Sequence, residues 1–525
     1  GTQDYTYYGN TASKKDDNGN TYTPAQQNPS DGSQQYGSAD DPNQGGANDP
    51  KSASTSSSQY EQNLNNKFNS ANNVSVKGNS ANAALNIPTS SDSTVTSARS
   101  AYTNDANLAS AFDTGVNNTF AQYGQQDAES GKWRGVVAGN STPQDWYLTT
   151  HTTADTTNAY DQAYRGAVAA MNAYFDKNNN YQGIKSVQQS TTGSAYYQQG
   201  FNDVVSQAAQ GIAYVQNGYQ YVSVLTGNTN TSTGGNVASG VNTNRLASDI
   251  DLTGAGNTEN NLNVSTNTST FTIDGQNHLM DTHGNGYIIG GSLSNLYVQN
   301  FQTIYGYNYF GPFRGQNGST VHFGNLNYVG PQLLSSYNND AYFFGNVNVV
   351  APINNNASYT SPFQSNVVVE GNGNQENLEV KNLVLQAGAH YFGATAYVSG
   401  GTNIVVQGNL TMDVGSKMTL VSRGNGTGAT SPDSSSFGIY LQNGGDLNIK
   451  KNATLNIIPA SFKGNSQVLG GAVYADGSSS LNIDGGSLNF EGYQGSISFY
   501  NQPIDLKGQS SINVFNGGLL QVLAD

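Results

Sequence analysis

The stretch ENLEVKNLVL at 376–385 carries a short pattern that returns four more times before residue 515. The other copies are TNIVVQGNLTMDV at 402–414, DLNIKKNATLNI at 446–457, SLNIDGGSLNF at 480–490 and PIDLKGQSSINVF at 503–515. Each copy alternates apolar and polar residues, turns at Gly, Asn or Lys, and alternates again, so that one face of each strand is buried and the other is wet. No copy can bury its apolar face alone, whereas a stack of copies forms a continuous core. The sequence therefore predicts an all-β fold, a β-solenoid of the right-handed parallel β-helix type.

Two regions that differ from each other in composition and in the spacing of apolar residues precede the solenoid. Residues 1–91 are rich in Asn, Gln, Ser, Asp and Gly and poor in aliphatic residues, so they cannot bury enough apolar surface to offset their ordering entropy. We expect a disordered spacer there, with a contact arm or a glycosylated stalk as the alternative. Residues 92–220 show helical spacing and are expected to form a small α-helical domain. The parallel β-helix is expected over 221–525, beginning with YVSVLTG at 221–227.

Two segments of the helical region place apolar residues three and four positions apart, as an amphipathic helix does. They are NAYDQAYRGAVAAMNAYF at 158–175 and SAYYQQGFNDVVSQAAQGIAYVQNG at 194–218. Ser194 is placed to cap the start of the second helix, and Gly218 to end it. Residues 97–124 are a less regular third candidate. Alanine and glycine on the apolar faces predict close contact between the helices.

Composition and charge exclude several classes of protein. The 525-residue chain has a formal net charge of −15 and a pI near 4.6, which argues against nucleic acid and anionic membranes as partners. It has no cysteine and only 10% charged residues, as expected of an exported bacterial surface protein. No apolar run approaches the ~18 residues of a membrane span, so no membrane insertion is expected. The start at Gly1 without a signal peptide, and the end within a repeat, favour a fragment of a longer chain.

The motifs DIDLTG at 249–254 and TIDGQNH at 272–278, followed by the LNI-type rungs, resemble a known family. They are similar to the pectate-lyase-like β-helix domains of Gram-positive cell-surface adhesins, in particular those of lactobacilli and the binding regions of serine-rich-repeat adhesins. The resemblance extends over residues 221–525. It implies a secreted, wall-anchored protein that binds host epithelial or mucin glycans, a polysaccharide or matrix. The family's wall-sorting motif and long serine repeat do not occur in this sequence, so anchoring is implied by the resemblance alone.

The same architecture serves polysaccharide lyases and hydrolases, which bring several carboxylates together with a basic residue. From residue 221 onward the nine Lys and Arg are scattered along the chain. Asp274, Asp281 and His283 are the nearest approach to a catalytic cluster, and we expect them to serve as corner residues and caps of turns. No catalytic residue, metal ligand or cofactor is expected.

One run between the helices has the beginning of a calcium-loop pattern. Residues 176–180 read DKNNN, which matches the D-x-N-x-N start of an EF-hand loop. Tyr181 and Val187 stand where that loop needs its Gly and its bidentate Glu. The sequence therefore predicts a plain polar turn.

Aromatic density is the strongest functional signal in the solenoid. YGYNYFGPFRG at 305–315 is followed by AYFFG at 341–345 and AHYFGATAY at 389–397. A ring that faces outward offers a flat surface on which a sugar stacks. The candidate ligand-binding residues are Tyr305, Tyr307, Tyr309, Phe313, Arg314, Tyr342 and Tyr391. Half or more of the aromatic rings are instead expected in the core, including Phe310 and Phe344, and for the three tyrosines at the start of the first run both locations stay open.

Three functions stay open. The first is an adhesin whose lateral solenoid face binds glycans or matrix. The second is homotypic self-association between cells through Asn, Thr and Ser hydrogen bonds, and the third is a polysaccharide lyase or hydrolase. From residue 221 onward the chain has seventeen Asp and Glu against nine Lys and Arg, together with four His. Because carboxylates titrate near ~4 and His near ~6.5, binding to anionic partners is expected to strengthen as the pH falls.

Overall fold

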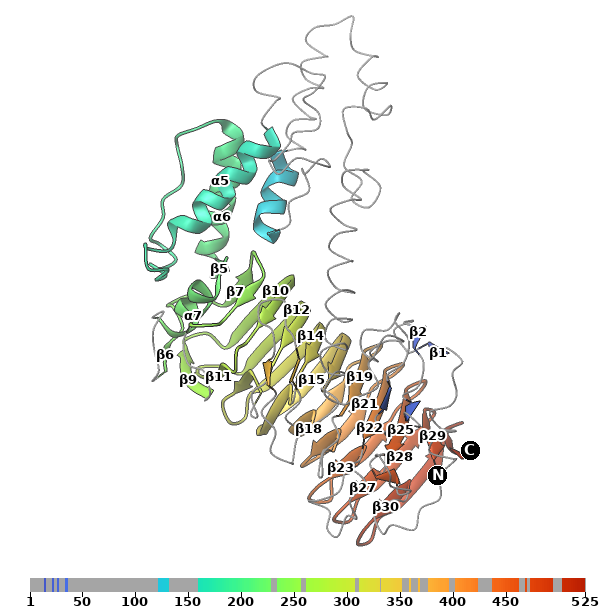
Figure 1. Ribbon diagram of the computed structural model, residues 1–525. Coiled ribbons are helices and arrows are strands. Elements are labelled where there is room, and N and C mark those ends of the chain that lie inside the picture. Colours follow the sequence, from blue (N-terminus) through green and yellow to red (C-terminus); the bar gives the residue numbers. More distant parts are fainter. Residues whose placement is uncertain are drawn as a thin grey trace, which may run out of the picture. The chain divides into compact units, whose positions relative to one another are not determined.

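The structure is a computed structural model of the chain, drawn in Figure 1. It describes residues 121–131, 159–227, 234–255, 261–306, 311–330, 332–351, 376–395, 402–423, 437–461, 473–493 and 503–524, and the short strands β1 (Lys14–Lys15), β2 (Thr21–Tyr22), β3 (Gln26–Gln27), β4 (Gln34–Gln35), β16 (Ser358–Tyr359), β17 (Val367–Val368) and β26 (Val468–Leu469). Apart from β1 to β4, the predicted spacer at 1–91 lies outside the described residues.

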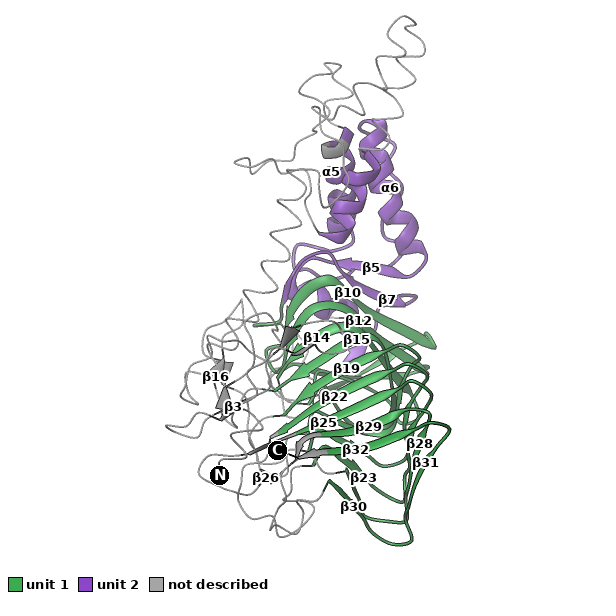
Figure 2. Cartoon of the chain, turned by 90° about the vertical axis from the view of Figure 1, so that its right-hand side faces the viewer, with its two compact units in different colours: residues 1–67, 232–234, 251–525 green, residues 68–231, 235–250 purple. Residues whose placement is uncertain are grey.

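The chain divides into two compact units (Figure 2). One comprises residues 68–231 and 235–250 and is named the helical unit. The other comprises residues 1–67, 232–234 and 251–525 and is named the solenoid unit.

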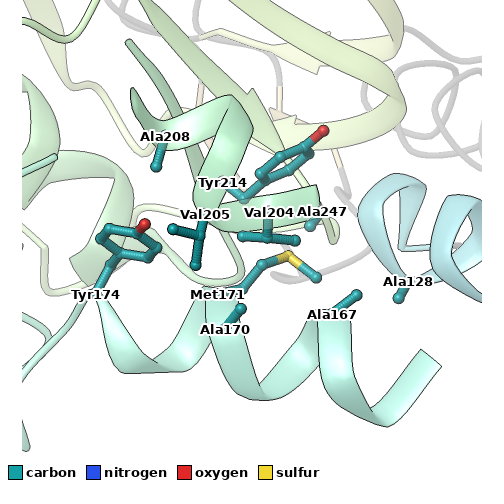
Figure 3. Packing of buried hydrophobic residues seen from close by; sticks show 10 residues of the cluster. All are labelled: Ala128, Ala167, Ala170, Met171, Tyr174, Val204, Val205, Ala208, Tyr214 and Ala247. Carbon is teal, nitrogen blue, oxygen red and sulfur yellow. The ribbon is translucent and has the colours of Figure 1, made fainter. Parts of the chain in front are cut away.

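In the helical unit, α5 (Ala159–Ala173) and α6 (Ala195–Ala209) form where the spacing of apolar residues predicts helices, and residues 121–130 are also helical. Ser194 caps α6 as predicted, because its Oγ accepts a hydrogen bond of 3.1 Å from the backbone N–H of Tyr197. Met171 of α5 and Tyr174, which follows α5, lie with Val204 of α6 in the buried core of this unit (Figure 3).

Two glycines bring α5 and α6 into backbone contact. A Cβ atom on Gly166 would lie 2.0 Å from the carbonyl oxygen of Tyr197, and one on Gly200 would lie 2.0 Å from that of Ala163. No side chain fits at either position. The close helix contact predicted from small residues on both faces is confirmed.

The segment after α6 differs from the prediction of one helix over 194–218. The helix ends at Ala209, and the next residues form strand β5 (Ile212–Val215), which pairs in parallel with β7 (Thr243–Leu246). The β-branched and aromatic residues IAYV favour a strand, and Gly211 adopts a left-handed φ of 94° that ends the helical geometry before them. The remaining short strands of this region are β6 (Gly235–Asn236) and β8 (Ile250–Asp251).

The prediction that the solenoid begins with residues 221–227 is wrong, because residues 221–226 lie in helix α7 (Gly218–Thr226). Every residue of α7 except Tyr219 is buried, and a short, continuous apolar run does not distinguish a buried helix from a buried strand. The caps do distinguish them. Asn217 accepts a hydrogen bond from the backbone N–H of Gln220, and Gly227 ends the helix in the left-handed conformation.

The solenoid unit consists of parallel strands that return to three positions on successive turns of the chain. Each position gives a stack of strands, named face A, face B and face C in chain order. Face A contains β9 (Asn261–Thr266), β11 (Gly286–Gly291), β13 (Phe313–Gly315), the first residues of β15 (Leu334–Val350) and β18 (Leu378–Leu385), β20 (Ile404–Val406), β23 (Ile439–Leu441), β27 (Val473–Ala475) and β30 (Ile504–Leu506).

Faces B and C share the longer strands. Face B contains the first halves of β10 (Thr270–Asp281), β12 (Asn295–Tyr305) and β14 (Thr320–Val329), the middle of β15, the end of β18, and β21 (Leu410–Met412), β24 (Leu447–Ile449), β28 (Ser480–Asp484) and β31 (Ser511–Phe515). Face C contains the second halves of β10, β12 and β14, the end of β15, and β19 (His390–Ala394), β22 (Lys417–Arg423), β25 (Thr454–Ser461), β29 (Ser487–Tyr493) and β32 (Leu519–Ala524).

The repeated LNI pattern forms columns of like residues through the core. Leu410, Leu447 and Leu481 pair in register on successive turns of face B, and each is at most 1% exposed. Burying one such side chain contributes about 1.5–3 kcal/mol. The pairs are parallel, as predicted for a solenoid and unlike antiparallel hairpins, so each turn completes the core of the turn before it.

Candidate functional site

An aromatic column runs along the outside of face B. Tyr297 of β12, His322 of β14 and Tyr342 of β15 pair in register on successive turns. The rings of Tyr297 and His322 stack with centroids 4.1 Å apart and planes 7° apart, and the Tyr342 ring stands at 67° to the imidazole, 5.3 Å away. The Nε2 atom of His322 lies 2.9 Å from Oδ1 of Asn295. Because the imidazole is largely buried, loss of solvation lowers the His322 pKa below its usual value.

Phe344 extends this surface towards the corner between faces B and C. Alternation along β15 turns Phe343 into the core, with its ring 5.6 Å from that of Phe323, and turns the partly exposed Phe344 outward. Its ring lies over Gly324 on the preceding turn, since a Cβ built on that glycine would be 2.0 Å from Cε2 and 2.3 Å from Cδ2 of Phe344. Only glycine leaves room for the ring to lie against the sheet. Tyr297, His322, Tyr342 and Phe344 together are named the aromatic patch.

An open depression of about 430 Å³ lies at the same corner and is named the amide depression. Its lining consists of Asp274, Gln276, Asn277, Asn300 and Asn325. The Oδ1 atom of Asp274 accepts hydrogen bonds from the backbone N–H of Gln276 (3.0 Å) and from Nδ2 of Asn300 (3.4 Å). Carboxylate and amide groups in fixed orientations provide the acceptors and donors that sugar hydroxyls require.

The aromatic patch and the amide depression adjoin each other. Asp274, Gln299, Gly324 and Phe344 form one column of face B on four successive turns, and the Phe344 ring reaches back over Gly324 towards the other end of this column. Asn325 follows Gly324 directly in the chain. The two features therefore form one surface with an aromatic side and a polar side.

A second group of polar residues lies on face A. Glu376 is partly buried, and desolvation, together with a hydrogen bond to Glu379 and repulsion by its charge, raises the Glu376 pKa well above its usual value. The Oε2 atom of Glu379 accepts a hydrogen bond of 3.1 Å from Ser335. Burial lowers the pKa of Arg314, an effect that the negative charge of Glu379 opposes. This group places two carboxyl side chains close to one another and to a cation.

Further along face A stands a compact aromatic cluster. The rings of Phe437 and Tyr474 stack at 4.6 Å with planes 4° apart, and Tyr440 meets the Tyr474 ring at 84°. Lys507 lies 5.9 Å from the centre of the Tyr474 ring and forms an ion pair of 2.9 Å with Asp505. Because Phe437 is 0% and Tyr474 4% exposed, these two rings are covered and do not offer a face to a ligand.

The helical unit contains a buried carboxyl network. Desolvation, followed by a hydrogen bond to Asp203 and repulsion by its charge, raises the pKa of Glu129 to about 9. Gln207 donates to Asp203 over 2.7 Å and accepts from the Tyr214 hydroxyl over 2.5 Å. Arg245 lies against the Tyr214 ring, 5.8 Å from its centre. The network joins the helix at 121–130 to α6 and to strands β5 and β7.

The structure separates the candidate ligand-binding residues predicted from the sequence. Tyr342 faces outward in the aromatic patch, and Arg314 faces outward on face A, so the structure does not bring these two together on one face. Tyr307 and Tyr309 lie outside the described residues, as does Phe310. The placement of Tyr305, Phe313 and Tyr391 on the binding surface is wrong, because they are 0%, 1% and 2% exposed.

The causes of these errors are local. A register irregularity between Phe301 and Ile304 interrupts the alternation of β12, and all five residues from 301 to 305 are buried. Phe313 pairs with the buried Tyr287, so it belongs to the inner column of face A. Tyr391 pairs with Val347 and Met418, both 0% exposed, in the inner column of face C.

The prediction for Phe344 is wrong in the opposite sense, because a residue predicted to lie in the core lies on the outside. The sequence analysis assigned it to the core, whereas it is partly exposed on the outside of face B. Two adjacent phenylalanines on one strand point to opposite faces, so one of the pair must face outward. Tyr297, His322 and the polar residues of the amide depression were also missed. Tyr297 and His322 could have been predicted to face outward, because apolar residues alternate with them in NLYVQ and TVHFG.

The carboxylates considered for catalysis cap turns, as predicted. Asp281 Oδ1 accepts a hydrogen bond of 2.9 Å from the backbone N–H of His283, and Asp274 caps the turn at Gln276. Asp176 likewise receives the backbone N–H groups of Asn178 and Asn180, so this run is a polar turn. Among the described residues, no three His, Cys, Asp or Glu side chains gather in a group that could hold a metal ion.

Two solved structures resemble this chain, and both are serine-rich repeat proteins (SRRPs), the group to which the sequence motifs are similar. The L. reuteri 53608 SRRP is 13% identical, with a TM-score of 0.41, and the match covers 59% of this chain and 99% of that chain. The L. reuteri 100-23 SRRP is 14% identical, with a TM-score of 0.36, and the match covers 59% of this chain and 95% of that chain. No protein-family model and no curated protein matches the sequence.

Within the described part of the chain, none of the helices combines the length and the apolar character needed to cross a membrane.

Proposed function

We propose that this chain is the binding part of a secreted bacterial cell-surface adhesin, anchored to the wall in its full-length form. A right-handed parallel β-helix presents face B to host epithelial or mucin glycans, to a polysaccharide or to matrix. The observation that carries the proposal is the Phe344 ring lying against the sheet over Gly324, next to the amide depression.

The chemistry of this surface suits sugars. A pyranose ring stacks its C–H face on an aromatic ring and directs its hydroxyls sideways. Face B supplies the ring in Phe344 and the polar partners in Asp274, Asn300 and Asn325 on the neighbouring turns. Since these partners are held by the solenoid backbone and by hydrogen bonds to one another, little side-chain entropy is lost when a ligand binds.

A lyase or hydrolase receives less support. Both Asp274 and Asp281 use a carboxylate oxygen to cap a turn. We propose that acidic polysaccharides are not turned over. Release of unsaturated or reducing ends from pectin or a glycosaminoglycan, lost in Asp281→Ala or His283→Ala, would restore the enzyme hypothesis.

Self-association is the second candidate, and an outward amide ladder favours it. Asn448, Asn482 and Asn513 occupy successive turns of face B. Nδ2 of Asn482 donates to Oδ1 of Asn448, and Nδ2 of Asn513 donates to Oδ1 of Asn482, each over 2.9 Å. Such a ladder lies on the outside of the sheet, where it can pair with an equivalent ladder on another copy. Light scattering without added glycan measures this: growth of particles by the wild type that Asn482→Ala prevents supports self-association, and a constant particle size contradicts it.

Binding to anionic glycans is proposed to strengthen in acid, because protonation of surface carboxylates removes repulsion. Two groups differ from exposed ones. The raised pKa of Glu376 means that this carboxyl loses its charge at a higher pH than an exposed glutamate, and the lowered pKa of His322 means that this imidazole gains a charge only at a lower pH than an exposed histidine. Added salt at pH 7 should strengthen anionic binding in the same way, since it screens the repulsion.

Binding of the purified chain to a glycan array tests the proposal. Phe344→Ala should weaken the strongest interactions about two- to tenfold, the loss expected for one aromatic stacking contact. The matched control is Tyr219→Ala, which removes a ring that is 41% exposed in the helical unit. If the two variants bind equally well, with circular dichroism spectra like the wild type, face B is not the binding surface.

A further inference from the structure

The binding surface on face B is elongated along the solenoid. Its polar side places Asp274, Asn300 and Asn325 on three successive turns, and its aromatic side places Tyr297, His322 and Tyr342 on successive turns beside them. The surface therefore covers four turns, from β10 to β15. Adjacent strands lie about 4.8 Å apart, so the span from Asp274 to Phe344 is about 14 Å.

This repeat suits a linear polymer. An extended chain of pyranose units advances by nearly one strand spacing per unit, so successive sugars meet equivalent positions on successive turns. A chain that lies parallel to the solenoid axis meets the polar side on the turns of β10, β12 and β14 and the rings on the turns of β12, β14 and β15. A chain that crosses the axis leaves the surface after one or two units.

The charges of the same four turns select against acidic sugars. Strands β10, β12, β14 and β15 contain no Lys or Arg. Asp274 and Asp340 flank the aromatic column on its two sides, and the nearest basic residue along the next strand is the exposed Lys381, at the turn beside Asn382. His322 lies within the patch as a largely buried imidazole next to Asn295. A carboxylated or sulfated sugar placed here meets negative charge and no cation within these strands.

We propose that the ligand of face B is an uncharged, unbranched polysaccharide that lies parallel to the solenoid axis across four turns, with one sugar unit on each turn. This inference rests on the proposed function and specifies its ligand class. Anionic glycans then bind the same surface weakly at neutral pH and approach the affinity of the uncharged polymer only in acid.

Calorimetry with the whole chain tests the inference on matched oligosaccharides. The probes are cello-, manno-, xylo- and chito-oligosaccharides from the disaccharide to the hexasaccharide, and the cello-oligosaccharides oxidised to the carboxylate at C6. We expect the affinity of at least one uncharged series to rise at each step up to four units and then to level off. The oxidised series should bind at least several-fold more weakly at pH 7.

Two variants locate the effect. Phe344→Ala should weaken the uncharged oligosaccharides, as the proposed function requires. Asp340→Asn keeps the side-chain oxygen that accepts from Asn382 over 2.9 Å and removes the charge, so it should raise affinity for the oxidised series and leave the uncharged series unchanged.

The outcomes are distinguishable. If the oxidised series binds more tightly than the uncharged one at pH 7 and still depends on Phe344, face B is a glycan site but the ligand class is wrong. An affinity that stops rising at the disaccharide overturns the axial orientation. If neither series binds, or no binding depends on Phe344, the proposed function fails and this inference fails with it.

Discussion

The imidazole of His322 lies parallel to the phenol ring of Tyr297, with 4.1 Å between their centroids, on neighbouring turns of the solenoid. The two rings cover each other's faces and leave their edges outward. A protonated imidazole would lose hydration in this position, since the ring is only 7% exposed. The stack therefore works best with a neutral His322.

We predict that His322 titrates below ~6.5, the value of an unperturbed histidine. Its pKa is lower in the folded than in the unfolded chain, so its contribution to stability is full above ~6.5 and is lost as the pH falls towards the folded value. Histidine resonances followed by NMR against pH measure the midpoint. The variant His322→Phe keeps an aromatic ring without the titration, and its stability should fall less in this range. A His322 midpoint at or above that of a free histidine would contradict the prediction.

We predict that Gly324→Ala and Phe344→Ala weaken glycan binding by similar factors. The added methyl group displaces the Phe344 ring, because its carbon would lie 2.0 Å from Cε2, whereas the second substitution removes the ring. Both changes abolish the same contact, so the double variant should bind no more weakly than Phe344→Ala alone. Additive losses in calorimetry would mean that Gly324 acts on the ligand by another route.

We predict that Gly200→Ala lowers the free energy of unfolding of the helical unit by about 1–3 kcal/mol. In the interior of an isolated helix the same change stabilises by up to about 1 kcal/mol, so the predicted sign is the reverse of intrinsic propensity. The cause is the carbonyl oxygen of Ala163, 2.0 Å from the position of the new Cβ. Urea unfolding followed by circular dichroism measures it. Ala195→Gly, on the exposed start of α6, is the control and should cost only the propensity difference.

We predict that Glu129 makes the helical unit less stable at higher pH. Its pKa rises from 4.5 to about 9 on folding, so its contribution is full below 4.5 and is lost as the pH rises through 9. Glu129→Gln replaces the protonated carboxyl by a neutral amide and should flatten this dependence. Unfolding in urea at about pH 5 and about pH 8 compares the two proteins. If Glu129→Gln lowers the free energy of unfolding by the same amount relative to the wild type at both pH values, the Glu129 carboxyl has only a packing role.

The sequence predicted the periodic parts of the fold and missed the places where the period changes. The alternation in ENLEVKNLVL and its copies gave the parallel stacks, because each apolar position pairs with its equivalent on the next turn. The spacing in 158–175 and the hydroxyl of Ser194 gave α5 and the start of α6. Helix α7 was not predicted. A helix that is buried on almost every side has no polar face, so its sequence lacks the 3.6-residue alternation of apolar and polar residues that marks an amphipathic helix.

The candidate site was predictable only in part. Aromatic residues indicated the region of the chain in which the proposed binding surface lies, but the side on which each ring lies depends on strand phase. An irregularity in β12 buried Tyr305, whereas strict alternation in β15 turned Phe344 outward. The contact between Phe344 and Gly324 joins residues twenty positions apart on neighbouring turns, and only the register of β14 and β15 brings them together. The amide depression also depends on register.

The outward column of face B contains Tyr297, His322 and Tyr342 and reaches Asn448, Asn482 and Asn513 on later turns, while the adjacent inward columns stay apolar throughout. From one turn to the next, the outward residues of face B thus change from aromatic to amide while the inward residues stay apolar. If the proposed ligand binds one unit to each turn, duplication of a turn that carries aromatic residues would lengthen the accepted ligand by one unit without repacking the interior. Loss of such a turn would shorten that ligand by the same step.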